Sequence, residues 1–410
     1  MTGVLERRLG TFDAVVVGLS AMVGAGVFAV FAPAAGAAGR WLLAALALAA
    51  VVAYCNATSS ARLAALYPES GGTYVYGRRR LGPFWGYLAG WGFVTGKTAS
   101  CAAMALTFGT YAAPALARPL AVGAVVALTT LNLYGVRRSA TAARITVAVV
   151  LTVLATVATT AFLAPPAATP ASAPASTVWG VLQGAGLLFF AFAGYARIAT
   201  MGEEVREPAR TIPRAIGVAL GITLAVYLLV GLAALAVLGP ARLAASAAPL
   251  VDVVEAAGAG GLGPVVRVGA AVAALGALLA LILGVSRTAF AMARERDLPG
   301  ALDAVHPVRR VPHRAELAVG AAVIALVLVA DLRGAIGFSS FGVLVYYAIA
   351  NASALTLNAG EGAPPRIVPV AGLVLCLVLA ATLPWASVAA GVAVFAVGAG
   401  VWGWRHRGAT

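Results

Sequence analysis

Residues 20–28 read SAMVGAGVF and lie in the middle of the first long apolar segment of the chain. A membrane helix rarely places three small residues, here Gly24, Ala25 and Gly26, at its centre. Small residues loosen the helix and leave backbone amides free to meet another group. A second interruption, around Gly194 in FFAFAGYARIAT, follows about 170 residues later. Two interrupted apolar segments in corresponding halves of a membrane chain indicate a transporter with a binding site at mid-membrane.

Composition favours the same class of protein. The chain has 410 residues, 62% of them apolar and 10% charged, and its mean hydropathy is +0.96. Apolar runs of roughly 20 residues recur along the whole length, and each is long enough to cross a bilayer as a helix. The sequence therefore predicts an all-α integral membrane protein with the lipid bilayer as its surroundings.

The net charge of +14 does not indicate a nucleic-acid partner, because the basic residues gather in alternate predicted loops. The N-terminus leads into a full-length span without an A-x-A-like cleavage site, so we expect no signal peptide. The three cysteines lie far apart within spans, and the three histidines lie in loops or the tail without metal-ligand spacing. We therefore expect no metal, no cofactor and no enzymatic activity.

The hydropathy pattern predicts twelve spans in a single transmembrane domain covering residues 1–410. Two connecting segments, 165–177 and 240–263, are expected to be loops; the second contains Asp252 and Glu255. The predicted spans are 12–37, 40–66, 83–113, 119–136, 141–164, 178–202, 213–239, 264–294, 315–331, 336–359, 366–384 and 385–404.

Arginine positions predict the orientation. Eighteen arginines fall in one set of predicted loops and five in the other. We expect the protein to lie in the cytoplasmic membrane, and the positive-inside rule then places both termini in the cytoplasm. Spans one to five (12–164) and six to ten (178–359) form two blocks that begin with the two interrupted segments. Because five is odd, the blocks have opposite orientation, which predicts an inverted repeat with two additional helices at 366–404.

Several stretches resemble the amino acid–polyamine–organocation (APC) permeases. They are GLSAMVGAGVF in the first span, FFAFAGYARIATMGEEVREPARTIPRAI from the sixth, SRTAFAMARERDLPGALDAVHP after the eighth, and FSSFGVLVYYAIANASAL in the tenth. The resemblance covers nearly the whole chain. It implies a LeuT-like 5+5 inverted repeat, unwound first and sixth helices, alternating access, and an amino acid as the small-molecule substrate.

The two interruptions suit the two charges of an α-amino acid. Free N–H groups at a half-helix N-terminus attract a carboxylate, and free carbonyls at a half-helix C-terminus accept from an ammonium. By resemblance, the carboxylate would meet the amides of Gly24, Ala25 and Gly26. The ammonium would meet carbonyls near three further residues, with Gly194 allowing the second break: Met22, Phe190 and Ala193. For one such run alone, the competing interpretation is close helix packing.

Lys97 is the only lysine of the chain and lies in the middle of the third span. A cation at mid-bilayer costs about 2.5–3.5 kcal/mol on insertion scales, which makes it a candidate functional residue. The segment GPFWGY (82–87) resembles the bacterial arginine/agmatine exchangers and would place Lys97 on the cavity side of its helix. Three roles stay open: a proton-coupling group, a fixed charge that selects the substrate, or a structural contact to backbone carbonyls.

Arg197 follows Gly194 by one turn, and Ala196 stands where many relatives carry an acid. A site with Lys97 and Arg197 and without that acid should repel arginine and polyamines, so we expect neutral or acidic amino acids, with neutral ones favoured. Arg197 could equally anchor to a carbonyl or to Glu203. Sodium coupling is not expected, because the middle of the eighth span lacks the hydroxyls that a hard cation needs.

Gating residues are less well defined by the pattern. Glu203 and Glu204 could latch the cytoplasmic end to arginines such as Arg294 or Arg78, or they could simply end the sixth helix. Phe189 is a candidate gate, although aromatic residues in apolar spans more often pack against their neighbours.

The sequence as a whole predicts a proton-coupled, sodium-independent amino acid transporter without an obligatory protein partner. An exchanger, a metabolite exporter and a non-transporting sensor or subunit remain alternatives.

Overall fold

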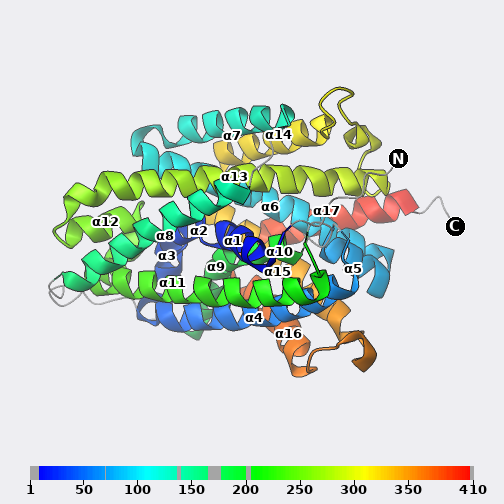
Figure 1. Ribbon diagram of the computed structural model, residues 1–410, viewed down its shortest axis with the longest axis horizontal. Coiled ribbons are helices and arrows are strands. Elements are labelled where there is room, and N and C mark those ends of the chain that lie inside the picture. The colour runs from blue at the N-terminus through cyan, green and yellow to red at the C-terminus, as the bar shows by residue number, and fades with distance from the viewer. Residues whose placement is uncertain (1–8, 70, 136–139, 165–176, 200–204, 407–410) are drawn as a thin grey trace.

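The computed structural model describes residues 9–69, 71–135, 140–164, 177–199 and 205–406. Helices make up almost all of this part of the chain (Figure 1). The extended pairing found within these ranges is one isolated bridge between Leu9 and Val205. The all-α prediction is confirmed.

The helices follow one another with short connections. In chain order they are α1 (Thr11–Met22), α2 (Gly26–Ala29), α3 (Phe31–Ala38), η1 (Gly39–Trp41), α4 (Leu42–Leu66), α5 (Thr73–Arg80), α6 (Pro83–Ala112), η2 (Pro114–Leu116), α7 (Ala117–Leu133), α8 (Ala140–Leu163), α9 (Val178–Phe192), η3 (Ala193–Tyr195), α10 (Ala196–Ala199), α11 (Pro208–Ala245), α12 (Pro249–Ala256), η4 (Gly260–Leu262), α13 (Gly263–Arg294), η5 (Gly300–Asp303), α14 (His313–Val329), α15 (Leu332–Leu355), η6 (Ala359–Glu361), α16 (Ile367–Thr382) and α17 (Trp385–His406).

Each of the twelve predicted ranges contains helix, but a helix counts as a membrane span only if it is long and apolar enough to cross the bilayer. Within the described ranges, nine helical segments are long and apolar enough to cross a membrane. The segment α14 has 17 residues and α16 has 16. A multi-pass membrane protein is therefore confirmed, and the count of twelve stays a prediction.

Two local features differ from the expected pattern. The predicted loop 240–263 contains α12, whose Leu250, Val251, Val253 and Val254 are buried. Pro249 begins this helix, and the apolar residues recur at helical spacing, so the loop prediction was wrong there. The preceding helix continues through the predicted end at 239, where Gly239 takes a positive φ of 66° before Pro240 and bends the chain.

The long helix α6 lies at the centre of the bundle and packs against α13 and α15. Its contact with α15 depends on glycine. A Cβ added at Gly342 would lie 3.0 Å from the backbone oxygen of Gly92 and from the Cα of Gly96. Small residues let membrane helices approach this closely, so the α6–α15 contact is a tight backbone-to-backbone interface.

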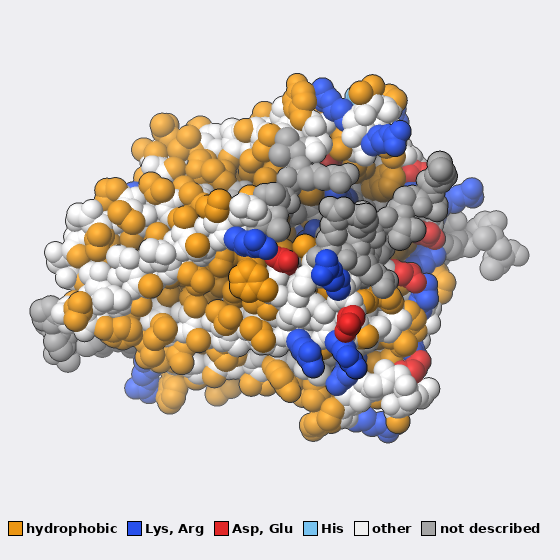
Figure 2. All heavy atoms as spheres, in the orientation of Figure 1, with side chains coloured by type: hydrophobic (Ala, Val, Ile, Leu, Met, Phe, Trp, Pro, Cys, Tyr) orange, Lys and Arg blue, Asp and Glu red, His pale blue; other side chains and the backbone are white. Residues whose placement is uncertain are grey.

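Charged side chains gather at one end of the molecule. This arginine-rich end is formed by α5 with Arg78, Arg79 and Arg80, by the end of α13, and by the end of α17 (Figure 2). Much of the remaining visible surface is apolar, as expected for helices that face lipid.

Candidate functional site

Two helix breaks form the centre of the candidate site. The first apolar segment is interrupted between α1 and α2 at residues 23–25. In the described part of the chain, no backbone carbonyl accepts a hydrogen bond from the amides of Gly24, Ala25 or Gly26. The second break is a tightening into the 3₁₀ turn η3 between α9 and α10. Both lie where the sequence places the interruptions.

The glycines of the two breaks hold the chain segments together. A Cβ at Gly194 would lie 2.5 Å from the carbonyl carbon and oxygen of Ala21 and 2.7 Å from the Met22 nitrogen. A Cβ at Gly26 would lie 2.9 Å from the Cβ of Ala191. Only glycine fits at these two positions, because the opposing atoms are mostly backbone. The breaks therefore pack directly on each other.

Tyr227 of α11 contacts both breaks, at Met22 of α1 and at Ala191 of α9. Its buried hydroxyl donates to the Met22 carbonyl at 2.5 Å and lies 3.1 Å from the Ala191 carbonyl. A hydroxyl carries one hydrogen, so the two carbonyls compete for it. Sequence reasoning missed this residue, because a tyrosine within an apolar span carries no sign of its distant partner.

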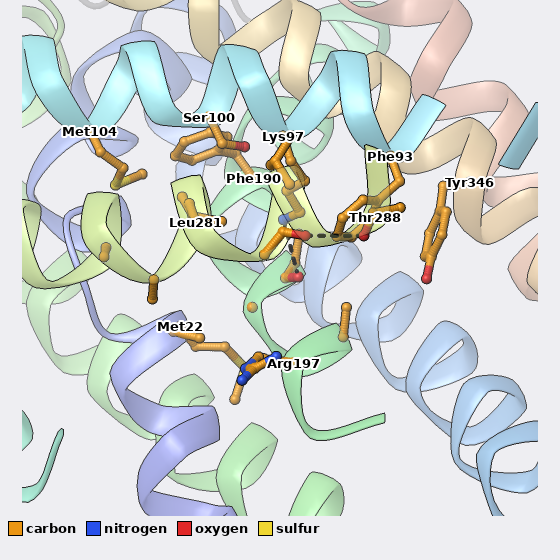
Figure 3. A pocket seen from close by; sticks show the side chains of 18 of the residues that line it. Met22, Phe93, Lys97, Ser100, Met104, Phe190, Arg197, Leu281, Thr288 and Tyr346 are labelled. Carbon is orange, nitrogen blue, oxygen red and sulfur yellow. Dashed lines mark hydrogen bonds between the residues drawn. The ribbon is translucent and has the colours of Figure 1, made fainter. Parts of the chain in front are cut away.

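A cavity of about 200 Å³ opens beside the breaks (Figure 3). Its walls come from α1 and α2, α6, α9 to α10, and α13, with Tyr74 of α5 and Tyr346 of α15 near one end. Phe93, Met104 and Leu281 add apolar surface. A volume of this size matches a small organic ligand.

Most predicted site residues meet at this cavity. The lining includes Met22, Ala25, Gly26, Lys97, Phe190, Ala193, Gly194, Ala196 and Arg197. Gly24 is outside the lining, since its Cβ position faces Ala277 of α13 at 3.2 Å. Phe189 is also outside it and packs edge-on against Tyr347 with 5.8 Å between ring centres. Glu203 and Glu204 lie outside the described residues.

Lys97 is 7% exposed and points from α6 toward η3 (Figure 3). Its Nζ donates to the Ala193 carbonyl at 3.4 Å, a long hydrogen bond. Together with Tyr227 on Met22, this contact occupies two of the carbonyls expected to receive an ammonium group. In this conformation, the Met22 and Ala193 carbonyls therefore already accept hydrogen bonds from side chains of the protein.

Cationic side chains predominate in the described lining of the cavity. Its described lining contains three cationic residues, Lys97, Arg197 and Arg287, and no carboxylate. Arg287 of α13 was not predicted, although it directly follows Ser286 in SRTAFAMARERDLPGALDAVHP, one of the stretches that carry the family resemblance. Thr288 and Ser100 add hydroxyls; Ser100 is 2.6 Å from the hydroxyl of Ser339. The site is thus built to attract negative charge.

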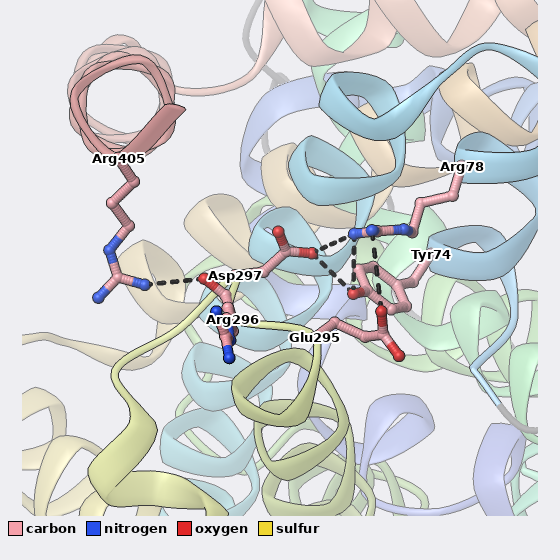
Figure 4. Close-up of polar contacts among 6 residues, drawn as sticks. All are labelled: Tyr74, Arg78, Glu295, Arg296, Asp297 and Arg405. Carbon is pink, nitrogen blue, oxygen red and sulfur yellow. Dashed lines mark hydrogen bonds and ion pairs between the residues drawn. The ribbon is translucent and has the colours of Figure 1, made fainter. Parts of the chain in front are cut away.

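A polar cluster lies beside the cavity at the arginine-rich end of the molecule (Figure 4). The ring of Tyr74 lines the cavity, and its hydroxyl donates to Asp297 at 2.7 Å. Arg78 pairs with the same carboxylate at 2.6 Å and with Glu295 at 3.8 Å. Burial and the Asp297 carboxylate raise the pKa of Tyr74, which keeps the phenol a donor.

This cluster bears on the predicted latch. Among the described residues, Arg78 forms ion pairs with Asp297 and Glu295. Glu203 and Glu204 lie outside these residues, so a latch between them and Arg78 stays a prediction. Arg405 of α17 donates to the Arg296 carbonyl at 3.1 Å and ties the last helix to the same turn. The contact therefore joins α5, α13 and α17.

Comparison with known proteins adds to this geometry. The family described as amino acid permease matches residues 9–403. An uncharacterized transporter of Mycobacterium tuberculosis is 67% identical over 404 residues, covering 98% of this chain and 92% of its own. The branched-chain amino acid permease BcaP of Bacillus subtilis is 25% identical, covering 94% and 90%. Cationic amino acid transporter 4 of Homo sapiens is 28% identical, covering 88% and 61%.

Proposed function

The chain belongs to the amino acid permease family, and we infer from its site that it is a sodium-independent, proton-coupled carrier of neutral amino acids. Membership of this family makes it a multi-pass membrane transporter rather than an enzyme. The observation that carries the substrate proposal is the cavity beside the two breaks, with three cations and no carboxylate in its described lining. Such a site disfavours a cationic side chain.

The proposed mode of binding uses the two breaks. The amides of Ala25 and Gly26 stand at the start of α2 and would hold the substrate carboxylate, as N–H groups at a helix start do for anions. The ammonium would replace Lys97 at the Ala193 carbonyl. Phe93, Phe190 and Met104 offer apolar surface to a neutral side chain.

A second candidate substrate class is supported by Arg287. Its position in the cavity lining adds a cation to Lys97 and Arg197 and would suit an acidic side chain. Of the relatives, the name of one refers to branched-chain and that of another to cationic amino acids. The cationic residues of the lining favour branched-chain over cationic amino acids as substrates.

We propose the following architecture and mechanism for the transport cycle. Twelve spans are arranged as a LeuT-like 5+5 inverted repeat, 12–164 and 178–359, plus two helices at 366–404. Both termini face the cytoplasm, and the protein lies in the cytoplasmic membrane. The breaks and the polar cluster of Tyr74, Arg78 and Asp297 would move between the two access states, with Lys97 as a candidate proton carrier.

Ligand screening tests the substrate proposal. The twenty amino acids are added singly to purified protein, and thermal unfolding is followed, because a ligand stabilises the state that it binds. We expect stabilisation by neutral amino acids; stabilisation by glutamate and aspartate alone would select the second candidate. Stabilisation by arginine but not by neutral amino acids would overturn both.

Counterflow in proteoliposomes, with and without a pH gradient, tests the mode of transport. A proton-coupled carrier accumulates substrate faster when the gradient is imposed, whereas an obligate exchanger requires substrate on both sides and does not respond. Proton-dependent uptake that survives in Lys97→Met would remove Lys97 from the coupling role.

A further inference from the structure

A group of buried polar side chains lies behind the cavity wall, between α7 and α14. Glu316 is 0% exposed, and Asn132 and Thr129 are also buried. Both carboxylate oxygens of Glu316, both amide atoms of Asn132 and the Thr129 hydroxyl lack hydrogen-bond partners within the described residues. A buried carboxylate without partners is costly as an anion, so such a group is kept neutral or binds a ligand.

Three contacts show that α7 and α14 run antiparallel and fix their register (Figure 1). Arg118 at the start of α7 donates to the Leu328 carbonyl near the end of α14 at 3.1 Å. At the opposite end, Arg309 before α14 lies over the Tyr134 ring after α7, 4.0 Å from its centre. Between them, a Cβ at Gly320 would lie 2.9 Å from the Thr129 hydroxyl.

This register brings Asn132 and Glu316 to the same level. From the contact between Thr129 and Gly320, Asn132 lies about one turn further along α7. Glu316 lies about one turn from Gly320 along α14, in the same spatial direction because the helices are antiparallel. The carboxyl group, the amide and the hydroxyl, which we call the polar site, therefore lie along one side of the α7–α14 contact, without hydrogen bonds to one another.

Arg287 connects this polar site with the cavity. It belongs to α13, which packs against α14, and it also lines the cavity. The Arg287 guanidinium is near enough to Glu316 for their charges to interact, but the two groups make no hydrogen bond. The other titratable groups on the elements packed against α14 are Arg118 on α7; Tyr87, Lys97, Cys101 and Tyr111 on α6; Arg267 and Arg294 on α13; Asp303 in η5; and His313 and Arg314 on α14 itself. Arg287 and Lys97 both line the cavity from helices that pack against α14.

We propose that Glu316 is a proton-binding carboxyl group that Arg287 links to occupancy of the cavity. The proposal rests on the proton-coupled transport inferred above. A substrate carboxylate that enters the cavity draws the Arg287 guanidinium away from Glu316. Glu316 then takes a proton from water onto a carboxylate oxygen, with the Asn132 oxygen as acceptor for the new O–H. On substrate release the proton returns to water, and Arg287 again stabilises the anion.

Transport measurements test the link. Glu316→Gln keeps the shape and neutral charge of the protonated group, and Asp303→Asn serves as a control because Asp303 is an exposed carboxylate on the neighbouring η5. In proteoliposomes we expect Glu316→Gln to lose the stimulation of uptake by a pH gradient while substrate counterflow stays within about twofold of the wild type. Full stimulation in Glu316→Gln, or uptake that needs sodium and ignores the gradient, would overturn the proposal.

Infrared spectroscopy tests the proton site without any transport. The other described glutamates, at positions 69, 207, 255, 295 and 361, are exposed or partly exposed. Among the described glutamates, a protonated buried carboxyl band that disappears as the pH rises, and that shifts on isotopic labelling of glutamate, should therefore arise from Glu316. This wild-type measurement does not depend on whether the variant folds. A wild type that transports no amino acid would refute the proposed function alone, whereas absence of the band at every pH would refute the proton site.

Discussion

Gly194→Ala tests whether contact between the two breaks positions the site. The added Cβ would lie 2.5 Å from the carbonyl carbon and oxygen of Ala21 and 2.7 Å from the Met22 nitrogen. Carbon contacts are favourable near 3.5–4.0 Å, so the segments must separate by about 1 Å. Overpacking costs about 1–3 kcal/mol, and the upper end applies because backbone atoms cannot rotate away.

The expected loss is worked from that cost. About 3 kcal/mol corresponds to roughly a hundredfold weaker substrate affinity, since each 1.4 kcal/mol is a factor of about ten. Substrate-induced thermal stabilisation and counterflow in proteoliposomes both measure it. The breaks would shift relative to each other, so we expect substrate binding to fall in addition to the stability of the unliganded protein.

Gly284→Ala is the matched control. Gly284 also lines the cavity, but a Cβ there meets nothing within 4 Å, and alanine favours the helix α13. We expect affinity close to that of the wild type. Unchanged affinity in Gly194→Ala, or an equal loss in Gly284→Ala, would show that contact between the breaks does not set the site.

Three further substitutions address other contacts. Tyr227→Phe removes the hydrogen bond to Met22 and should cost about 1–3 kcal/mol of stability, seen as earlier thermal unfolding than in the wild type; an unchanged unfolding curve would contradict a structural role for that hydroxyl. Asp297→Asn leaves Arg78 without its closest ion pair and should expose the arginine-rich end to cysteine-reactive reagents at an introduced Ala291→Cys, with Ala291→Cys alone as control. Arg80 and the Asn358 amide lower the pKa of Glu361 in the folded protein. The stability that the Glu361 carboxylate adds is therefore present above its unfolded-state pKa and is lost as the pH falls through the lowered pKa. Glu361→Gln should abolish this part of the acid sensitivity of thermal unfolding, and identical pH profiles for the variant and the wild type would contradict the role of Glu361.

Much of the fold could be predicted because hydropathy and helix-breaking residues act locally. The interruptions at residues 23–25 and 193–195 follow from small residues within a few positions of each other. The prediction of residues 240–263 as a loop was wrong at α12, because this short amphipathic helix also contains the charged residues Asp252 and Glu255. A twelve-span count needs the position of the lipid, which helix lengths alone do not provide.

The cavity was harder to predict, because its residues come from helices far apart in sequence. Lys97 was found because a lone cation in an apolar span is conspicuous. Arg287 was missed although it lies in a predicted span, 264–294. Tyr227 and Glu316 depend on which neighbours face them, and that depends on helix register rather than on local pattern.

The glycine contact between α6 and α15 has a consequence for how the molecule can move. Gly92, Gly96 and Gly342 bring the two main chains so close that a side chain does not fit between them, so we expect the two helices to move as one unit. Lys97 is the next residue after Gly96, so we expect its backbone to move together with this pair of helices. Displacement of Lys97 by a substrate, or movement of η3 relative to this helix pair, would each lengthen the distance from Lys97 Nζ to the Ala193 carbonyl.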